Sequence, residues 1–467
     1  MALALGYCWP QSVVAGESLV LHVESDDSVD VRVVRDGLEP TQVFALEGIS
    51  AGAHPIATGE NWRSGLYVVR LRRSGRDTPD PATAWFVVRS PTPASSRLFV
   101  LATNTWNAYN DVGGLNYYTG AVRLSFARPL PIGMLDKPSG HGERLVDGGR
   151  AYMDFCAAHA LSTWHGMAGW AGQERRFAMW AERNGIDLEY ATNLDLHTDG
   201  SLLDGYEAFL SVGHDEYWSW EMRDHVDAFI DAGGRAAFLS GNTCYWQVRI
   251  DGTDMVCFKH RFEEDPVFGT ADEHLTTTMW ADPIVGRPEA SMTGVSFTRG
   301  GYHRIHNSVR HGTGGYEVHR PDHWLFDGVR LARGDQLGAS LSAVGYECDG
   351  CELELRDGLP SAVAQHGTPA SFEVLATAPA TPFDANSTPL PLAPGADYEL
   401  EFHARRLLGD ASPENCRRLR HGHAVLGTYT RGEGTVVTTG STEWAYALDD
   451  PAIDRITRNV IGVPSRG

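Results

Sequence analysis

The sequence predicts an α/β protein in which an immunoglobulin-like β-sandwich precedes a parallel-sheet domain that carries a β-rich insertion. Residues 1–94 hold short strand-like runs separated by Gly or Pro turns, which is typical of a sandwich. From residue 95 onward, buried-strand patterns alternate with helical ones. A Gly-, Pro- and His-rich stretch with short β-like runs interrupts the alternation. We therefore predict a sandwich over 1–94, an α/β domain over 95–283 and 412–467, and an insertion over 284–411.

The N-terminal module has apolar runs of strand length that are rich in β-branched residues. They are Ser18–Glu24, Val29–Val34, Leu66–Leu71 and Trp85–Val88. A Pro- and Ser-rich linker, Ser90–Ser95, follows them. Because the module shows no cluster of catalytic residue types, we expect the chemistry to lie in the following domain.

Predicted strands and helices alternate along the α/β domain. The strands are Leu98–Ala102, Asp187–Ala191, Tyr206–Val212, Arg235–Ser240 and Thr435–Gly440, and the helices are Gln173–Asn184, one that begins at Ser219, and Pro451–Ile461. This order predicts a parallel sheet with helices on both faces. Ligands of such sheets bind at the carboxyl ends of the strands. The residues that follow each strand are therefore the first candidates for a site.

The residues after the predicted strand at 206–212 are the most informative. They include three side chains that can bind a metal or move a proton, namely His214, Glu216 and Tyr217. The next strand is followed by the polar and aromatic residues 242–246. Because both loops open on the same edge of the sheet, we expect them to be neighbours in space.

Composition limits the partners of the chain. Its 467 residues carry 60 acidic and 39 basic side chains, a formal net charge of -21. Such a charge would repel nucleic acid and anionic membrane surfaces, so we predict neither as a partner. No run approaches the roughly 18 apolar residues of a membrane span, and the N-terminus lacks the basic region of a secretory signal. Seven cysteines, an odd number, favour reduced thiols, so we expect a cytoplasmic protein.

Several candidate residues have a structural interpretation as well as a functional one. We expect the tyrosine-rich segment 103–118 to be a loop at a strand end, and it could be a packing or carbohydrate-stacking surface. His214 could lie in a surface turn. Asn242 could be a turn residue and Glu347 an exposed strand residue. For the C-x-x-C pair at 348 and 351 no second pair of matching spacing exists, so we expect a turn with two unpaired thiols.

Taken together, several ordered motifs resemble the large subunit of N,N-dimethylformamidase and its relatives. The resemblance covers most of residues 95–460, and a preceding β module is common in that family. The motifs are Asn107–Asn110, Gly113–Tyr118, Ser125–Pro129, Gly213–Trp218, Gly241–Asn242 and Val344–Glu347. The resemblance implies a flavodoxin-like catalytic domain, similar to that of class I glutamine amidotransferases but without their cysteine nucleophile.

The resemblance also implies a metal site. Family members hold a mononuclear iron, expected to be Fe³⁺, through two tyrosinates and one glutamate, and hydrolyse a formamide. The matching ligands here are Tyr109, Tyr118 and Glu216. Tyr117 and Tyr217 remain alternatives for the second phenolate.

Three polar residues of the family site correspond to His214, Asn242 and Glu347. The family turn usually has proline where this chain has Asp215, a departure that leaves the substrate open. We expect an iron-dependent hydrolase of a small amide-like substrate, acting with a small partner subunit or as a homo-oligomer. A non-catalytic small-molecule or carbohydrate-binding protein, and a biosynthetic lyase or oxygenase, are the alternatives.

Overall fold

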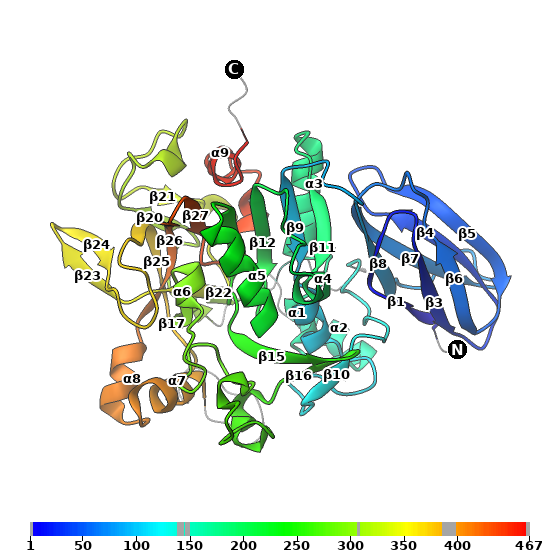
Figure 1. Cartoon of the computed structure of the whole chain (residues 1–467), viewed down its shortest axis with the longest axis horizontal. Helices are drawn as coiled ribbons and strands as arrows, with labels where there is room; N and C mark the ends of the chain where they lie inside the picture. Colours follow the sequence, from blue (N-terminus) through cyan, green and yellow to red (C-terminus); the bar gives the residue numbers. More distant parts are fainter. Residues whose placement is uncertain (1–2, 138–143, 145–149, 306–308, 385–397, 464–467) are drawn as a thin grey trace. The chain divides into compact units, whose positions relative to one another are not determined.

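The computed structural model describes residues 3–137, 144, 150–305, 309–384 and 398–463 (Figure 1). In this part of the chain the protein is a mixed α/β protein with several sheets, as predicted. Packing divides the chain into two compact units. The first comprises residues 1–144, 148–206 and 251–255, and the second comprises residues 145–147, 207–250 and 256–467.

Two sheets make up the N-terminal part of the first unit (Figure 1). The three-stranded sheet has the order β1 (Leu5–Trp9), β3 (Ser18–Glu24) and β6 (Gly52–Ala57). The five-stranded sheet has the order β2 (Ser12–Val14), β8 (Ala84–Arg89), β7 (Gly65–Arg73), β4 (Val29–Arg35) and β5 (Thr41–Ile49). Alternate residues of β3 and β4 are buried in one shared apolar core, so the period-2 pattern predicts these strands correctly.

The rest of the first unit contains a parallel strand pair and several helices. β9 (Arg97–Leu101) and β11 (Glu189–Thr192) pair in parallel. The other elements are α1 (Thr103–Tyr109), β10 (Arg123–Ser125), α2 (Arg150–His159), a 3₁₀ turn η1 (His165–Met167), α3 (Gln173–Arg183) and α4 (Asn193–Thr198). The segment after β9 was expected to be a loop, but its first seven residues form α1, whose side chains are all buried. Burial within the unit thus overrides a composition typical of loops.

The main sheet of the second unit begins with three parallel strands. β12 (Ala208–His214), β14 (Arg235–Gly241) and β27 (Gly434–Thr438) pair in parallel, as predicted. Every residue of β12 is buried, which is typical of a strand covered on both faces. Four further strands then extend the sheet in antiparallel fashion; three of them lie in the segment predicted to be β-rich, but their pairing with the main sheet was not predicted. They are β26 (Gly422–Arg431), β25 (Glu373–Ala380), β20 (Tyr316–Val318) and β21 (Gln336–Leu337).

Two smaller strand pairs in the second unit place site residues. β17 (Ser296–Tyr302) pairs with β22 (Glu347–Gly350), and β13 (Tyr217–Ser219) pairs with β15 (Trp246–Asp251). The helices are α5 (Trp220–Asp231), α6 (Ala290–Thr293), α7 (Glu399–Leu408), α8 (Pro413–Leu419) and α9 (Pro451–Val460). The remaining strands are β16 (Asp254–Val256), β18 (Arg304–Ile305), β19 (Val309–Arg310), β23 (Leu353–Arg356) and β24 (Leu359–Ala362). The 3₁₀ turns are η2 (Lys259–Glu264), η3 (Glu273–Leu275), η4 (Trp324–Phe326), η5 (Ala339–Leu341) and η6 (Trp444–Ala447).

Helix α5 begins where the sequence predicts. The hydroxyl of Ser219 accepts a hydrogen bond from the backbone N–H of Met222, which is an N-cap. The prediction missed strand β13 immediately before the helix, because its three residues are too few to show a periodic pattern.

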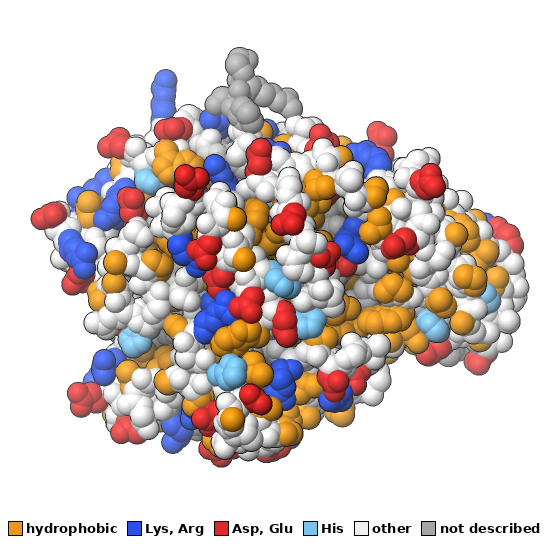
Figure 2. Space-filling view, viewed as in Figure 1, with side chains coloured by type: hydrophobic (Ala, Val, Ile, Leu, Met, Phe, Trp, Pro, Cys, Tyr) orange, Lys and Arg blue, Asp and Glu red, His pale blue; other side chains and the backbone are white. Residues whose placement is uncertain are grey.

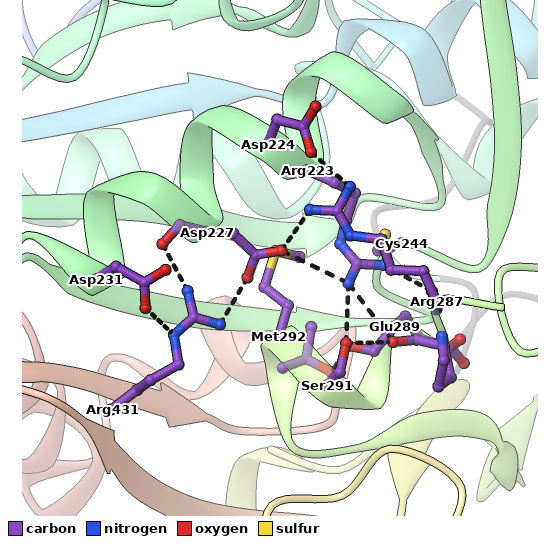
Figure 3. A network of polar contacts seen from close by, with 12 residues as sticks. Arg223, Asp224, Asp227, Asp231, Cys244, Arg287, Glu289, Ser291, Met292 and Arg431 are labelled. Atoms are coloured by element: carbon purple, nitrogen blue, oxygen red, sulfur yellow. Dashed lines mark hydrogen bonds and ion pairs between the residues drawn. The ribbon is translucent and has the colours of Figure 1, made fainter.

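A buried arginine fixes α5 against the segment before α6 (Figure 3). The Arg223 side chain is completely buried, and it donates to the Arg287 carbonyl at 3.2 Å and to the Ser291 hydroxyl at 3.1 Å. Arg287 in turn pairs with Asp227 at 2.6 Å. A buried guanidinium needs such partners, so this network ties α5 to α6 and to the segment before it.

All seven cysteines are free and buried. Cys348 lies in strand β22, where it pairs with Gly301 of β17. The turn predicted at this position is therefore wrong for Cys348. Acidic and basic side chains are interspersed on the face shown in Figure 2. Among the described residues, no helix combines the length and the apolar character that crossing a membrane requires.

Candidate functional site

Two tyrosine hydroxyls meet in the first unit. Tyr109 is the last residue of α1, and Tyr118 closes the loop that follows. Tyr118 donates a hydrogen bond of 2.5 Å to the hydroxyl of Tyr109, and the two ring centroids are 4.4 Å apart. The sequence analysis placed both residues on one loop, and the structure brings their oxygens together.

Asparagines and one arginine shape this loop. Asn116 donates to Asp111 at 2.7 Å and accepts from the backbone N–H of Tyr118 at 2.8 Å. Arg128 donates to the Asn107 carbonyl at 2.8 Å and to the Val112 carbonyl at 2.9 Å. These contacts fold the loop back on α1, which accounts for the asparagines and the arginine in the family motifs.

Neighbouring Tyr117 has a different environment. Its hydroxyl donates to the Met255 carbonyl at 2.6 Å, and its backbone N–H donates to the Ala108 carbonyl. Tyr118 instead stacks on Trp164, with centroids 5.9 Å apart. The two adjacent tyrosines therefore present their hydroxyls to different partners.

Polar side chains cluster at the strand ends of the second unit. Nε2 of His214, at the end of β12, lies 2.8 Å from Oε2 of Glu347 and 3.2 Å from Oε2 of Glu216. The Tyr346 hydroxyl lies 3.0 Å from Nδ1 of His214. All four side chains are buried, which excludes the surface-turn and exposed-strand interpretations of His214 and Glu347.

Asn242 occupies a sharp turn after β14. Its φ is +50°, an unfavourable conformation for a residue with a side chain. A Cβ at the preceding Gly241 would lie 2.5 Å from the Thr442 nitrogen and 2.6 Å from the Glu347 carbonyl, so only glycine fits there. The turn aims the Asn242 amide at Oε2 of Glu347, 3.2 Å away. Strained backbone of this kind often marks a functional site.

The two strand-end loops are neighbours, as predicted. The Asp215 carbonyl accepts from the backbone N–H of Cys244 at 2.8 Å, and the Glu216 carbonyl accepts from Trp246. Asp215, which replaces the family proline, is fully buried and accepts from the Ser211 hydroxyl at 2.8 Å. The aspartate is therefore accommodated by a local hydrogen bond.

Burial and charge shift several pKa values in this cluster. Burial disfavours the charged form of His214, but the Glu347 and Glu216 carboxylates outweigh it and raise its pKa well above the usual value. Burial also raises the pKa of Asp349 to about 7, although this carboxylate accepts the backbone N–H groups of Asn242 and Thr243. Asp349 can therefore hold or release a proton near neutral pH, whereas the raised pKa of His214 favours its protonated form.

The sequence analysis missed Lys259. Its ammonium lies 5.0 Å from the ring centroid of Trp246 and 5.8 Å from that of Tyr217. Burial lowers its pKa, while the Glu216 carboxylate opposes this shift. One sequence signal existed: Lys137 and Lys259 are the two lysines of the chain, and its other basic side chains are arginines.

A buried tyrosine–glutamate pair was also missed. Tyr302 donates to Oε1 of Glu399 at 2.6 Å, and burial raises the pKa of Glu399 to about 8. Glu399 lies at the start of α7, in a region without a recognisable motif, so no pattern in the sequence pointed to it.

Some of the side-chain oxygens described above suit a hard cation. Phenol and carboxylate oxygens are the ligands that ferric iron prefers, and the two phenols converge in the first unit. Among the described residues, no group of three or more His, Cys, Asp and Glu side chains is arranged to hold a metal ion. Phenol oxygens fall outside that set.

The fold and these side chains define an α/β protein with buried polar groups at the carboxyl ends of parallel strands. The chain belongs to the family described as N,N-dimethylformamidase beta subunit-like, C-terminal, whose model matches residues 52–458. This confirms the resemblance seen in the sequence motifs.

Two relatives share part of the chain. The N,N-dimethylformamidase beta subunit of Paracoccus aminophilus is 30% identical over 199 residues, covering 38% of this chain and 24% of the relative. The subunit of the same name from an Alcaligenes species is 29% identical over 199 residues, with the same coverage. The matched segment thus spans about a quarter of the length of these relatives.

Proposed function

We propose that this chain is an iron-dependent hydrolase that cleaves a small amide or a related C–N bond. One observation carries the proposal: the hydroxyls of Tyr109 and Tyr118 converge to 2.5 Å. Two phenol oxygens at this spacing suit neighbouring ligand positions on one hard cation. The relatives are named N,N-dimethylformamidases, which supports amide hydrolysis as the reaction class.

The third ligand in this proposal is Glu216, which we assign on the family resemblance. It follows β12 and is buried beside His214. When bound, ferric iron would polarise a substrate carbonyl and lower the pKa of a water molecule. Two tyrosinates and one carboxylate would leave positions open for both.

Side chains of the second unit would handle the proton. Glu347 is the base in this proposal, since its Oε2 is held by the Asn242 amide at 3.2 Å and lies 2.8 Å from His214. It would take a proton from the attacking water and give it to the leaving amine. His214, itself held by the Tyr346 hydroxyl, would orient Glu347, and the Asn242 amide would donate to the substrate or to Glu347.

We propose the finer fold assignment on the same basis. The two N-terminal sheets with one shared core support an immunoglobulin-like sandwich over 1–94. The parallel strands with a strained turn after β14 support a glutamine-amidotransferase-like domain over 95–283 and 412–467. In this view the segment 284–411 is an insertion that supplies Glu347.

The relatives are beta subunits by name, so we propose that this chain also acts in an assembly, with a partner subunit or with copies of itself. Light scattering of the purified chain, alone and co-expressed with a candidate small subunit, tests this directly. A monomer that is fully active would contradict it.

Visible spectroscopy with iron analysis tests the metal site without relying on activity. Ferric tyrosinate absorbs visible light by charge transfer, so the iron-loaded protein should be coloured. Tyr109→Phe and Tyr118→Phe should each shift or abolish the band. Tyr117→Phe should keep the absorption band, because the Tyr117 hydroxyl donates to the Met255 carbonyl. A colourless protein that cannot be loaded with iron would contradict the proposal, and activity lost without oxygen would exclude a hydrolase.

A further inference from the structure

The first unit contains a cavity of about 820 Å³ that none of the proposed site residues lines. Its walls are the end of β4, the start of β5, residues 61–67 at the start of β7, and the segment from the end of α3 to β11. Its volume lies in the range of about 300–1,000 Å³ that ligand sites occupy. The match to the family model begins at residue 52. The wall formed by residues 35–43 therefore lies outside the matched region.

A supported aromatic ring lines the cavity. Trp62 is half-buried and stacks on Tyr67, with centroids 5.2 Å apart and an interplanar angle of 15°. Tyr67 stacks in turn on Phe86 at 5.4 Å and 10°. The stack holds the indole in one orientation, so a ligand in the cavity meets a preformed flat apolar surface.

An ion pair fixes the two walls of the cavity to each other. Arg35 of β4 donates to Oε1 of Glu182 in α3 at 2.8 Å and to the Ser64 carbonyl at 3.2 Å. Oε2 of Glu182 accepts from the backbone N–H of Leu38 at 2.6 Å. Because both partners are engaged within the protein, the cavity is preformed and their charges largely cancel.

Charged side chains line the exposed part of the cavity. Glu39, Arg63 and Asp187 are exposed and line the cavity. Their side chains make no hydrogen bond or ion pair with any residue in the described part of the chain. With the Arg35–Glu182 pair, the cavity has two guanidinium groups and three carboxylates.

We propose that this cavity binds a neutral oligosaccharide. Mixed charges give no net attraction to a phosphate or to a polycation, whereas sugar hydroxyls donate to carboxylates and accept from guanidinium groups. The Trp62 ring offers the flat apolar surface on which the C–H face of a pyranose ring packs. The volume suits a short chain of sugars better than a single ring.

Isothermal titration calorimetry of the full chain with a panel of neutral oligosaccharides tests the proposal. The probes are maltotriose, cellotriose, xylotriose, mannotriose and chitotriose. At least one should bind with a stoichiometry of one. Arg63→Ala and Asp187→Ala should each weaken that binding about tenfold, since each removes a group that faces the ligand.

Matched controls separate the cavity from the surface. Arg76→Ala and Asp204→Ala remove exposed charges of the same unit that do not line the cavity, and they should leave affinity unchanged. Trp62→Phe should weaken binding less than Trp62→Ala, and urea unfolding will show whether Trp62→Ala also loosens the stack.

Three results would overturn the proposal. The first is no heat from any of the five sugars at concentrations of about 10 mM, the limit of useful affinity. The second is binding that Arg63→Ala and Asp187→Ala leave intact. The third is a clear preference for heparin fragments or spermine over the neutral sugars. None of these results bears on the colour of the iron-loaded protein, so this proposal and the proposed function can fail separately.

Discussion

Nε2 of His214 lies 2.8 Å from Oε2 of Glu347, and residue separation along the chain gives no hint of this contact. Both side chains are almost completely buried. A buried imidazole and carboxylate are costly to keep unless they pair, so this contact offsets part of the cost of burying both groups. The position of Glu347 at the start of β22, beside the turn at Asn242, creates this pair.

Glu347→Gln should abolish most amide hydrolysis. The substitution keeps the size of the side chain but removes the proton acceptor, and general bases contribute about 10²–10⁴ in rate. We expect kcat for N,N-dimethylformamide or a related formamide to fall by about 100-fold or more. Glu354→Gln, an exposed change on β23, is the control and should keep full activity. Normal turnover by Glu347→Gln, with unchanged circular dichroism, would remove Glu347 from the mechanism.

Substitutions at Asn242 should separate stability from activity. Asn242→Gly relieves the left-handed backbone, so its free energy of unfolding should equal or exceed that of the wild type. Asn242→Ala places a residue there that tolerates the left-handed region less well than asparagine, so it should lose about 1 kcal/mol. Both variants lose the amide that donates to Glu347, so both should lose at least about tenfold in kcat. Urea unfolding and initial rates measure the two effects, and an active Asn242→Gly would show that only the turn matters.

Lys259→Met should lower activity because it removes the cation near Glu216. The ammonium lies over the rings of Tyr217 and Trp246, and the methionine can fill the same space. Without it the neighbouring carboxylates repel each other more strongly, so we expect at least about a tenfold loss in kcat/KM. Lys137→Met is the matched control. Equal rates for the two variants would place Lys259 outside the site.

Glu289→Gln should change how stability depends on pH. Burial raises the pKa of Glu289 from 4.5 to about 7 in the folded protein, where it lies near Arg223 (Figure 3). Its carboxylate accepts from the Ser296 hydroxyl. Between these values the unfolded chain releases the proton and the folded protein keeps it. The free energy of unfolding of the wild type should therefore fall as pH rises through this window, by up to about 3 kcal/mol.

The Glu289→Gln variant has no proton to release at this position, so its free energy of unfolding should fall less than that of the wild type, with the remainder due to buried carboxyls such as Asp349 and Glu399. Urea unfolding at pH 4.5, 6 and 8 measures the difference. Glu263→Gln, an exposed change, should follow the wild-type curve. Parallel curves for the wild type and Glu289→Gln would show that the buried carboxyl titrates normally.

The sequence by itself determined several sandwich strands, the parallel strands of the α/β region, the main helices and the neighbouring strand-end loops. Period-2 burial in β3 and β4 and the Ser219 cap are local signals, and local signals can be read from neighbours along the chain. The family motifs also pointed to Tyr109 and Tyr118. The α1 helix and the antiparallel extension of the main sheet could not be predicted, because burial and long-range pairing decide them.

Only the tertiary structure decided which polar groups meet. In the structure the Tyr117 hydroxyl donates to a backbone carbonyl, whereas the Tyr118 hydroxyl donates to Tyr109. The spacing of residues along the chain cannot predict such a difference between two adjacent tyrosines. It also buried Lys259 and placed Glu347 against His214, across long separations in the chain. Contacts of this kind depend on how the sheet and its loops pack in three dimensions, and residue types alone carry no record of that packing.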